Sequence, residues 1–367
     1  MMQRLGLQNA DSFWFNRRMT PLVSIIIPTF DRPRYLQEAI EAVLAQTYSN
    51  IEVLIFDNGT LDETIAVAED AARRDPRVRF QRNERNLGMS ANFNALAGAA
   101  RGEFLVAIGD DDRLLPEFVS RLVGVMRPEL GVAFSNHYLI NAEGTRLEPE
   151  SREYTRHYGR DTIPAGVLEN ADAAAWRQSI PMSASLLRTT DLQRLRFRED
   201  LNTPDVEFFI RLALQGARFI FVPEYLMEYR IHLGAMTSSG LWSEELVDCL
   251  TPIEVKPEIE PYKRKLLIPM VVNAVSRCLQ QGNMERARAF LRNKYYPRSR
   301  RPWWNWSGDL PLSPGPAPDV CDEKGPALRR VFGRLLQGFC ANLPASVGSP
   351  IYRAVRRVSL GGFSGRA

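Results

Sequence analysis

The chain has 367 residues, of which 45% are apolar and 25% are charged, with 24 glycines and 24 prolines. This composition excludes collagen-like, wholly disordered and disulfide-scaffold proteins, and it allows two domains or one domain with a large appendage. The net charge of +4 hides an asymmetry, because residues 1–254 carry 27 basic and 36 acidic side chains, whereas residues 255–367 carry 20 basic and 7 acidic ones. An acidic body is thus followed by a basic tail.

The cysteines lie far apart and form no Cys-x-x-Cys pair, so the sequence predicts neither a disulfide framework nor a zinc site. They are Cys249, Cys278, Cys321 and Cys340. The first residues include Gln3, Arg4 and Asp11 and lack the apolar core of a secretory signal. No run reaches the roughly 18 apolar residues of a spanning helix. We therefore expect a cytoplasmic protein that meets a membrane, if at all, as a peripheral protein on the inner face of the plasma membrane.

Between residues 22 and 110, short apolar runs alternate with segments of helical periodicity. The runs typical of strands are Leu22–Ile27, Ile51–Phe56, Val78–Gln81 and Phe104–Ile108. The segments typical of helices are Tyr35–Ala45, Glu63–Arg73 and Ala91–Ala100. Strands that alternate with helices predict a mostly parallel sheet wrapped by helices, so the expected fold class is α/β.

Each of these predicted strands is followed by polar or turn-forming residues. The four segments are Pro28–Asp31, Asp57–Thr60, Asn83–Gly88 and Gly109–Asp112. Turns favour Asp, Asn and Gly for backbone reasons alone, so one or two such strand ends are expected without any function. Because ligands of open α/β sheets bind beyond the carboxyl ends of the strands, the four segments together form the candidate site.

The most specific feature among them is the acidic triplet Asp110–Asp112. In a helix or a tail such a triplet would be a solvated charge patch, but here it directly follows an apolar strand. Like charges held at a buried strand end repel one another unless a cation neutralises them. Oxygen ligands with no His or Cys nearby favour Mg²⁺ or Mn²⁺, with positions left open for phosphate oxygens. The triplet therefore predicts a divalent ion that binds a diphosphate.

Three stretches of the chain resemble the family 2 glycosyltransferases, a large inverting group with the GT-A fold. They are VSIIIPTFDRPRYLQEAIEAVLAQTYSNIEVLIFDNGT, RNLGMSANFNALAGAARGEFLVAIGDDDRLLPEF and DVEFFIRLALQGARFIFVPEYLMEYRIH, which follow the family's order and spacing between Pro21 and His232. The resemblance implies a Rossmann-like nucleotide-binding sandwich. It also implies a nucleotide-diphosphate-sugar donor, with UDP as the first expectation and GDP or TDP as alternatives.

Carried over position by position, the resemblance implies contacts between the donor and the first two strand ends. Pro28, Thr29 and Asp31 would line the base and ribose. Asp57 would accept a hydrogen bond from the base ring. Asn58 replaces the family's usual second acid.

The resemblance extends to the third and fourth strand ends. The segment with Asn86, Gly88 and Asn92 would close over the donor, although Phe93 stands where the family often has a basic residue. Asp110 would bind the ribose hydroxyls.

The metal ligands implied by the resemblance are Asp111, Asp112 and His232, holding Mn²⁺ or Mg²⁺. Gly109 stands at the first acid of the family's Asp-x-Asp-Asp motif. His232 closes the element Tyr229-Arg230-Ile231-His232, in which Arg230 and His232 would face one side of an extended segment and reach the diphosphate or the metal. A structural role is the alternative for His232.

An inverting transfer needs a base that takes the proton of the attacking acceptor hydroxyl. The pair Arg211-Leu212 sets the register of the family's acid-rich segment, which places Asp205 at the base, with Pro204 instead of the common Glu before it. The alternative for Asp205 is an acid that favours the dipole at a helix N-terminus.

The acceptor side is less clear, because the family covers residues 141–165 poorly. Tyr154, His157, Tyr158 and Trp176 are candidate sugar-stacking groups, with ordinary core packing as the alternative. The expected acceptor is a glycan or lipid-linked glycan of cell-surface polysaccharide assembly.

The expected domains are an N-terminal extension (1–20), a GT-A domain (21–240), a helical extension (241–295), a Pro/Trp-rich linker (296–325) and a basic amphipathic tail (326–367). The tail would contact an anionic membrane surface, with packing on the acidic body or a disordered tail as alternatives. Nucleic-acid binding is not expected, because no such motif accompanies the charge.

The sequence therefore predicts a metal-dependent inverting glycosyltransferase. A sugar nucleotidyltransferase is one rival, but its Gly-rich loop is missing where Pro28-Thr29-Phe30 stands. A non-catalytic scaffold of glycan assembly is the other, and the intact triplet and Asp205 argue against it.

Overall fold

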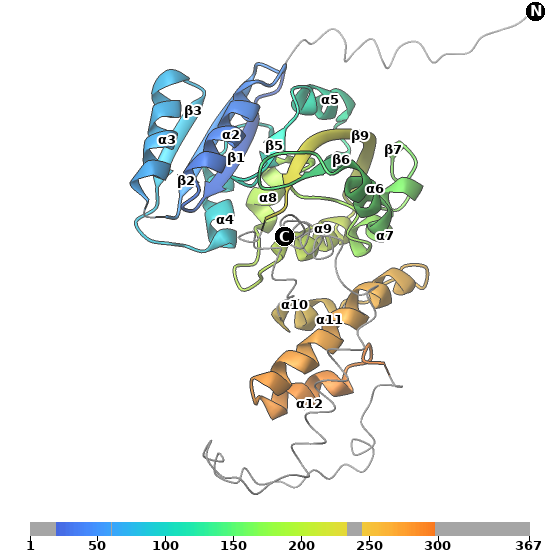
Figure 1. Ribbon diagram of the computed structural model, residues 1–367. Helices are drawn as coiled ribbons and strands as arrows, with labels where there is room; N and C mark the ends of the chain where they lie inside the picture. Colours follow the sequence, from blue (N-terminus) through green and yellow to red (C-terminus); the bar gives the residue numbers. More distant parts are fainter. Residues whose placement is uncertain (1–19, 60, 233–243, 298–367) are drawn as a thin grey trace, which may run out of the picture. The chain divides into compact units, whose positions relative to one another are not determined.

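A computed structural model describes residues 20–59, 61–232 and 244–297 of the chain. The described residues form two compact units, divided between Arg230 and Ile231 (Figure 1). The division falls before the boundary expected at residue 240. The linker and the basic tail expected after residue 296 lie almost wholly outside the described residues, as does the extension 1–20.

The first half of the α/β unit repeats a strand–helix pattern. Its elements are β1 (Val23–Thr29), α2 (Pro33–Leu44), β2 (Ile51–Asp57), α3 (Asp62–Arg74), β3 (Val78–Arg82), α4 (Met89–Ala99) and β4 (Phe104–Ala107). Strand β2 is buried along its whole length, which explains why all of its residues except Glu52 and the terminal Asp57 are apolar. Each predicted strand and helix of this half is present, with ends displaced by at most two residues.

The second half is less regular. Its elements are β5 (Arg113–Leu114), α5 (Phe118–Val125), β6 (Leu130–Ile140), α6 (Glu148–His157), η1 (Arg160–Thr162), β7 (Gly166–Val167), α7 (Ala171–Trp176), β8 (Ser185–Arg188), α8 (Thr189–Leu195), α9 (Pro204–Leu214) and β9 (Arg218–Arg230). Residues 141–165, which the family covers poorly, follow β6 and contain the helix α6.

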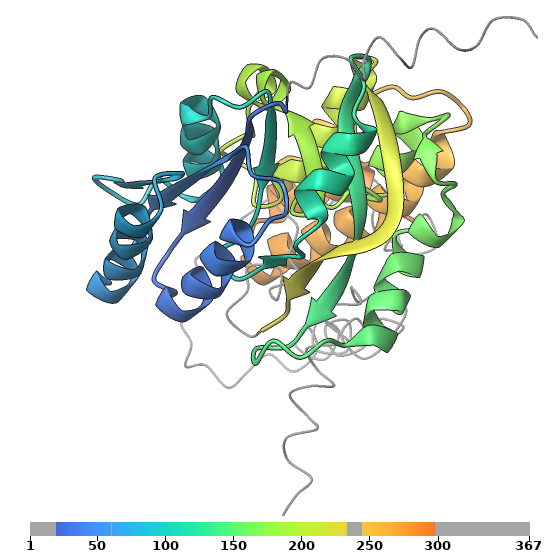
Figure 2. The ribbon, with the colours of Figure 1, turned by 90° about the horizontal axis from the view of Figure 1, so that it is seen from above.

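All of these strands join one mixed sheet in the order β3-β2-β1-β4-β8-β6-β9-β5, with β7 paired to β9. The pairs β3/β2, β2/β1, β1/β4 and β6/β9 are parallel, whereas β8 runs antiparallel to β4 and β6. Helices lie on both faces of the sheet (Figure 2). The expected α/β class with a mostly parallel sheet is confirmed.

The topology brings distant strand ends to one edge. Thr29, at the end of β1, lies opposite Asp57 at the end of β2. Strand β9 pairs with β5 immediately after the triplet, with Arg113 opposite Glu228. The core beneath this edge is built from apolar side chains of β1, β2 and β4 packed on α2 and α5, including Ile25, Val53 and Val106.

The second unit is helical in its described part. It contains α10 (Glu244–Leu250), α11 (Glu260–Gln280) and α12 (Met284–Arg292). Lys263 is buried and donates to the carbonyls of Thr251 (3.0 Å) and Ile253, which follow α10. In the part of the chain that the structure describes, no helix is long and apolar enough to cross a membrane.

Candidate functional site

The ends of β1 and β4 are joined through Asp110. Its Oδ2 atom accepts hydrogen bonds from the Thr29 hydroxyl (2.8 Å) and from the backbone N–H of Phe30 (3.2 Å). These bonds fix a carboxylate that is only 5% exposed. The first strand end and the triplet therefore form one rigid edge, as parallel strand ends must.

Asp112 is also buried, and the chain holds it from two sides. Its Oδ1 accepts from the backbone N–H of Arg230 (3.0 Å), and the Ser183 hydroxyl donates to the same carboxyl. Ser183 precedes β8 and was missed by the sequence analysis, because no motif marks it.

The triplet concentrates negative charge at a largely buried strand end. Loss of water and the neighbouring charge of Asp111 raise the pKa of Asp110 to about 6. The same two causes raise the pKa of Asp112 well above its usual range. A buried acid pair with raised pKa values is stabilised by any cation that joins it.

Arg32 supplies positive charge to this cluster. Its Nη1 atom lies 3.1 Å from Asp110 Oδ1 and 2.9 Å from Asp111 Oδ2. The residue stands directly before α2, where Pro33 fixes the backbone. Its pairing with residues about 80 positions away was not predictable from the sequence.

Gly109 stands at the position of the first acid of the family's motif, close to the side chains of Asp111 and Asp112. A Cβ atom at this position would lie 2.7 Å from Asp111 Oδ1 and 3.4 Å from Asp112 Oδ2. The missing side chain thus leaves room for carboxylate oxygens of both neighbouring acids.

These oxygens fit a hard divalent cation that takes its remaining ligands from phosphate. Within the described ranges, no group of three His, Cys, Asp or Glu side chains forms a metal cluster by itself. His232 is half-buried and follows the division between the two units.

The end of β2 presents a second buried acid. Asp57 is fully buried, and its Oδ1 accepts from the Gly59 N–H (2.9 Å). Among the described residues its Oδ2 has no hydrogen-bond partner. Burial raises the pKa of this carboxyl. An orphaned buried acceptor is costly unless a ligand donates to it.

Asp31 ties the first loop to the second. It has a φ of 53°, and its Oδ1 accepts from the Leu61 N–H (2.9 Å). A Cβ atom on Gly59 would lie only 2.2 Å from the same oxygen, so glycine is required for this close approach. Asp31 therefore shapes the loop beside Asp57.

Three asparagines hold the segment that follows β3. Asn83 donates to Asn58 Oδ1 (2.7 Å) and to Asn92 Oδ1 (2.9 Å), and Asn92 donates to the Phe56 carbonyl (2.9 Å). Asn92 is 1% exposed, so its amide supports the strand ends instead of facing a ligand. Asn58, at the position of the family's second acid, belongs to the same network.

The segment held by these asparagines ends at Gly88. Asn86 is exposed, and its Oδ1 accepts from the Gly88 N–H (2.8 Å). Gly88 has a φ of 80° and precedes α4. Asn86 and Gly88 thus form a turn at the surface of the edge.

Asp205 lies in the first turn of α9. Burial raises the pKa of its carboxyl, against the opposing effect of the backbone N–H groups of Asp205 and Val206. The segment before α9 is docked on α4, because the Asn94 amide bonds both the N–H (2.8 Å) and the carbonyl (2.9 Å) of Phe197. Asn94 therefore positions the chain that leads to Asp205.

Arg230 has a different place from the one expected. Its side chain is 0% exposed, its guanidinium donates to the carbonyls of Asp111 (2.8 Å) and Ala142 (3.0 Å), and it pairs with Glu38. The expectation that this group faces the diphosphate is wrong, because its donors are already used within the protein.

We predict that Arg230→Met destabilises the fold by about 2–4 kcal/mol, because Glu38 loses a buried cationic partner and the carbonyls of Asp111 and Ala142 lose a donor. Urea unfolding monitored by circular dichroism measures this change. Arg34→Met is the control, since Arg34 pairs with the same Glu38 at 3.4 Å but is 71% exposed. Equal stability of the two variants would contradict the role given to Arg230.

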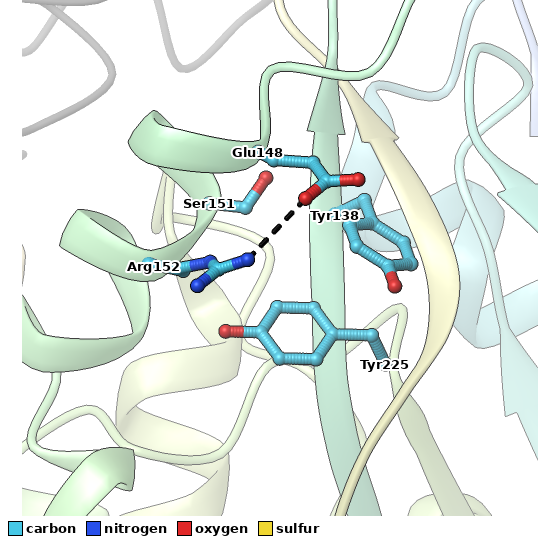
Figure 3. Close-up of a pocket in the computed structure, with 5 residues that line it drawn as sticks. All are labelled: Tyr138, Glu148, Ser151, Arg152 and Tyr225. Atoms are coloured by element: carbon cyan, nitrogen blue, oxygen red, sulfur yellow. Dashed lines mark hydrogen bonds and ion pairs between the residues drawn. The ribbon is translucent and has the colours of Figure 1, made fainter.

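One of the expected sugar-stacking groups is a core residue, because Trp176 is 1% exposed. Tyr154 is half-buried, and its ring packs 5.2 Å from His137 and 4.7 Å from Tyr158. Burial raises the pKa of the Tyr154 hydroxyl. A hollow of about 190 Å³ lies nearby, between α6 and the β6/β9 pair, and is lined by Tyr138, Glu148, Ser151, Arg152 and Tyr225 (Figure 3).

Comparisons with known proteins agree on one class of enzyme. Residues 24–183 match the model of the family described as Glycosyl transferase family 2. An uncharacterised glycosyltransferase of Methanocaldococcus jannaschii is 26% identical over 217 residues, which are 58% of this chain and 71% of that protein. The glycosyltransferase GlyG of Streptococcus pneumoniae is 24% identical, over 63% of this chain and 78% of that protein.

Solved structures share the fold. TarS of S. aureus, in complex with UDP-GlcNAc, has a TM-score of 0.56 at 16% identity, over 73% of this chain and 79% of that one. A mannosyltransferase of Pyrobaculum calidifontis, in complex with GDP-Man and Mn²⁺, has a TM-score of 0.54 at 15% identity, over 95% and 88%. Residues 24–183 are thus similar to the family 2 glycosyltransferases, and the chain is a glycosyltransferase enzyme.

Proposed function

We propose that this enzyme is a metal-dependent inverting glycosyltransferase that moves a sugar from a nucleotide-diphosphate donor to a hydroxyl of a glycan or lipid-linked glycan in polysaccharide assembly. The observation that carries the proposal is the meeting, at one sheet edge, of two groups. One is the triplet, in which Asp110 and Asp112 are buried, and the other is the Oδ2 of Asp57, which has no partner among the described residues. The triplet is stabilised by a cation, and the Asp57 carboxylate is stabilised by a hydrogen-bond donor. A metal-bound nucleotide diphosphate supplies both.

The donor would lie along the ends of β1, β2 and β4. Asp57 accepts from the base ring N–H, which relieves its orphaned oxygen. Pro28 and Thr29 border the base and ribose beside the loop that Asp31 shapes. Asp110, held by Thr29 and Phe30, presents Oδ1 toward the ribose hydroxyls. The segment that ends in Asn86 and Gly88 closes the nucleotide side.

The diphosphate end would lie at Asp111 and Asp112. A divalent ion bound there supplies Lewis-acid stabilisation of the charge that develops on the leaving diphosphate. Asp111 offers the more accessible carboxylate, since its side chain is 15% exposed, while Asp112 is pinned by Arg230 and Ser183. In the Pyrobaculum mannosyltransferase complex, which shares the fold, Mn²⁺ accompanies GDP-Man. Mn²⁺ or Mg²⁺ is proposed here on that chemistry.

Asp205 would act as the base that takes the acceptor proton. Its raised pKa makes the carboxylate a stronger base than an exposed aspartate. Attack from the face opposite the leaving diphosphate inverts the anomeric centre.

The donor is tested by incubating the purified chain and Mn²⁺ or Mg²⁺ with UDP-, GDP- and TDP-sugars. Binding is followed by calorimetry and nucleotide release by chromatography. We expect UDP-sugars to bind in a metal-dependent manner. A folded protein that binds none of these donors would contradict the proposal, and turnover of a sugar phosphate with a nucleoside triphosphate would favour a nucleotidyltransferase.

A finer prediction concerns Asp57. Asp57→Asn keeps the Gly59 bond but turns the orphaned acceptor into an N–H donor that opposes the base. We expect UDP affinity to fall at least about tenfold, with the folded state equally or more stable because a buried charge is removed. Calorimetric UDP titration and thermal melting measure both. Unchanged UDP affinity would remove Asp57 from the donor site.

The membrane contact is proposed for the basic tail, residues 326–367, which lie outside the described residues. Its arginines and apolar residues suit an anionic lipid surface on the inner face of the plasma membrane. Deleting the residues after Lys324 should abolish sedimentation with liposomes that contain anionic lipid.

A further inference from the structure

Arg32 pairs with Asp111, a carboxylate that a divalent cation would take, and with the neighbouring Asp110. Its Nη1 bridges Asp110 Oδ1 and Asp111 Oδ2 at 3.1 and 2.9 Å. Asp110 is additionally held by Thr29 and Phe30, so the pairing leaves its position unchanged. When a metal ion binds, Asp111 must therefore exchange the Arg32 guanidinium for the metal ion.

The surroundings of Arg32 allow its guanidinium to move. Its side chain is 27% exposed, while the side chains of Asp110 and Asp111 are 7% and 15% exposed. Its backbone is fixed at the start of α2 by Pro33, between the loop of Asp31 and the triplet. The guanidinium can therefore leave Asp111 without any change in the backbone.

We propose that Arg32 is a displaceable counterion of the triplet. Its guanidinium neutralises Asp111 while the divalent cation is absent. It leaves the Asp111 carboxylate when that cation binds, and it then pairs with the donor diphosphate. This inference rests on the proposed function. It predicts two effects of opposite sign when the charge is removed, because Arg32 opposes the metal and supports the nucleotide.

The test compares Arg32→Gln with wild type by two titrations. Removing a positive charge about 3 Å from the ligand oxygens should tighten Mn²⁺ binding roughly tenfold, measured by electron paramagnetic resonance of free Mn²⁺ without nucleotide. At saturating Mn²⁺, UDP affinity measured by calorimetry should fall several-fold. Arg32→Lys keeps the charge and should lie between the two.

Arg34→Gln is the matched control, because it removes the same charge two residues away from an exposed position paired with Glu38. It should change neither titration. A merely structural Arg32 would loosen the triplet and weaken both ligands together, and that result, or equal Mn²⁺ affinity of Arg32→Gln and wild type, would overturn the inference. If wild type binds neither Mn²⁺ nor UDP, the proposed function fails as well.

A separate observation concerns the hollow between α6 and β6/β9. The Tyr138 and Tyr225 rings form its aromatic wall, with centroids 4.8 Å apart and planes inclined by 31° (Figure 3). The wall is held in place, since the Arg146 guanidinium lies 4.3 Å from the Tyr138 ring and the Tyr225 hydroxyl bonds Thr155 at 2.9 Å. Both tyrosines are partly exposed.

The rim of the hollow carries charges of both signs. Glu148 and Arg152 are exposed and pair at 3.4 Å. A partly exposed aromatic wall with nearby hydrogen-bond acceptors and donors suits a pyranose, which has apolar ring faces and hydroxyls around its edge. A volume of about 190 Å³ holds one sugar unit.

The position of the hollow relates it to the triplet through the strand pair. Tyr138 lies two residues before Ile140, which is opposite Arg230, and Tyr225 lies five residues before Arg230. At about 3.3 Å per residue these separations are roughly 7 and 17 Å along the strands. A short oligosaccharide spans that distance.

We infer that the hollow is a subsite for a neutral sugar unit of the acceptor, remote from the reacting hydroxyl; this too rests on the proposed function. Saturation-transfer difference NMR with maltotriose, chitotriose and mannotriose as probes tests binding independently of transfer. At least one trisaccharide should give a signal that Tyr225→Ala and Glu148→Gln each reduce several-fold, and that Tyr262→Ala on α11 leaves unchanged. No signal from any probe, or a signal equal in Glu148→Gln and wild type, would overturn this subsite while the donor titrations decide the function.

Discussion

Asp205→Asn should lower the rate of sugar transfer by about 10²- to 10⁴-fold, the contribution typical of a general base. Donor affinity should stay unchanged, because Asp205 lies in α9 and not among the donor groups at the ends of β1, β2 and β4. The measurement is transfer to an identified acceptor, combined with calorimetric UDP titration. Asp200→Asn, an exposed acid paired with Arg198, is the control.

The pH dependence of transfer follows from the raised pKa of Asp205. The base must be ionised, so activity is lost as the pH falls through its folded-state pKa, which lies above the usual aspartate value. The acid limb of the wild-type profile should therefore lie at a higher pH than for an exposed aspartate. The Asn variant should lack this limb in its residual activity.

The thermal stability of the Asn variant distinguishes a catalytic role of Asp205 from a structural role. An acid whose pKa is raised by folding reduces stability as the pH rises through the interval between its unfolded and folded pKa values. At neutral pH the ionised Asp205 thus lowers the stability of the folded state, and Asp205→Asn should melt at an equal or higher temperature. An acid retained for the helix dipole would instead lose stability on this change. Full transfer by the variant, or a clearly lower melting temperature, would contradict the catalytic reading.

Asp111→Asn should abolish metal-dependent donor binding and lower transfer at least about 100-fold, because the leaving diphosphate loses its Lewis-acid stabilisation. It also removes the charge that contributes to the raised pKa values of Asp110 and Asp112. The fold should therefore be equally or more stable while the function is lost. Mn²⁺ titration by electron paramagnetic resonance and thermal melting with and without UDP measure both effects.

The control for Asp111 is Glu117→Gln, an exposed acid just before α5. It should leave Mn²⁺ binding and transfer unchanged. Mn²⁺ binding by Asp111→Asn with wild-type affinity would place the cation elsewhere. Loss of Mn²⁺ binding together with a large fall in melting temperature would indicate that Asp111 acts through the fold.

The strands of the first half and their polar ends could be predicted from the pattern of apolar and polar residues. Continuous apolar runs predict buried parallel strands because both faces of such strands meet helices, and each predicted strand of the first half is present. The polar segments after β1, β2 and β4 lie at one edge because parallel neighbours end together. The register of Thr29 with Asp57 is a direct consequence.

The individual roles within that edge were less predictable. Asn92, expected in the segment that closes over the donor, donates its amide to the Phe56 carbonyl. Arg230 is buried against backbone carbonyls and Glu38. Trp176 packs in the core and the half-buried Tyr154 packs on His137 and Tyr158, whereas Tyr138 and Tyr225 line the hollow. In each case the type of residue was compatible with two environments, and burial decided between them.

The sequence by itself determined the α/β alternation, the position of the acidic triplet at a strand end and the charge asymmetry of the chain, because these depend on local periodicity and composition. Only the tertiary structure decided which side chains meet. Arg32 with Asp111, Ser183 with Asp112 and Asn94 with Phe197 are contacts across 70 to 105 residues. They arise because strand order and helix packing, not spacing along the chain, fix the distance between two groups, and with it the charge that each acid experiences.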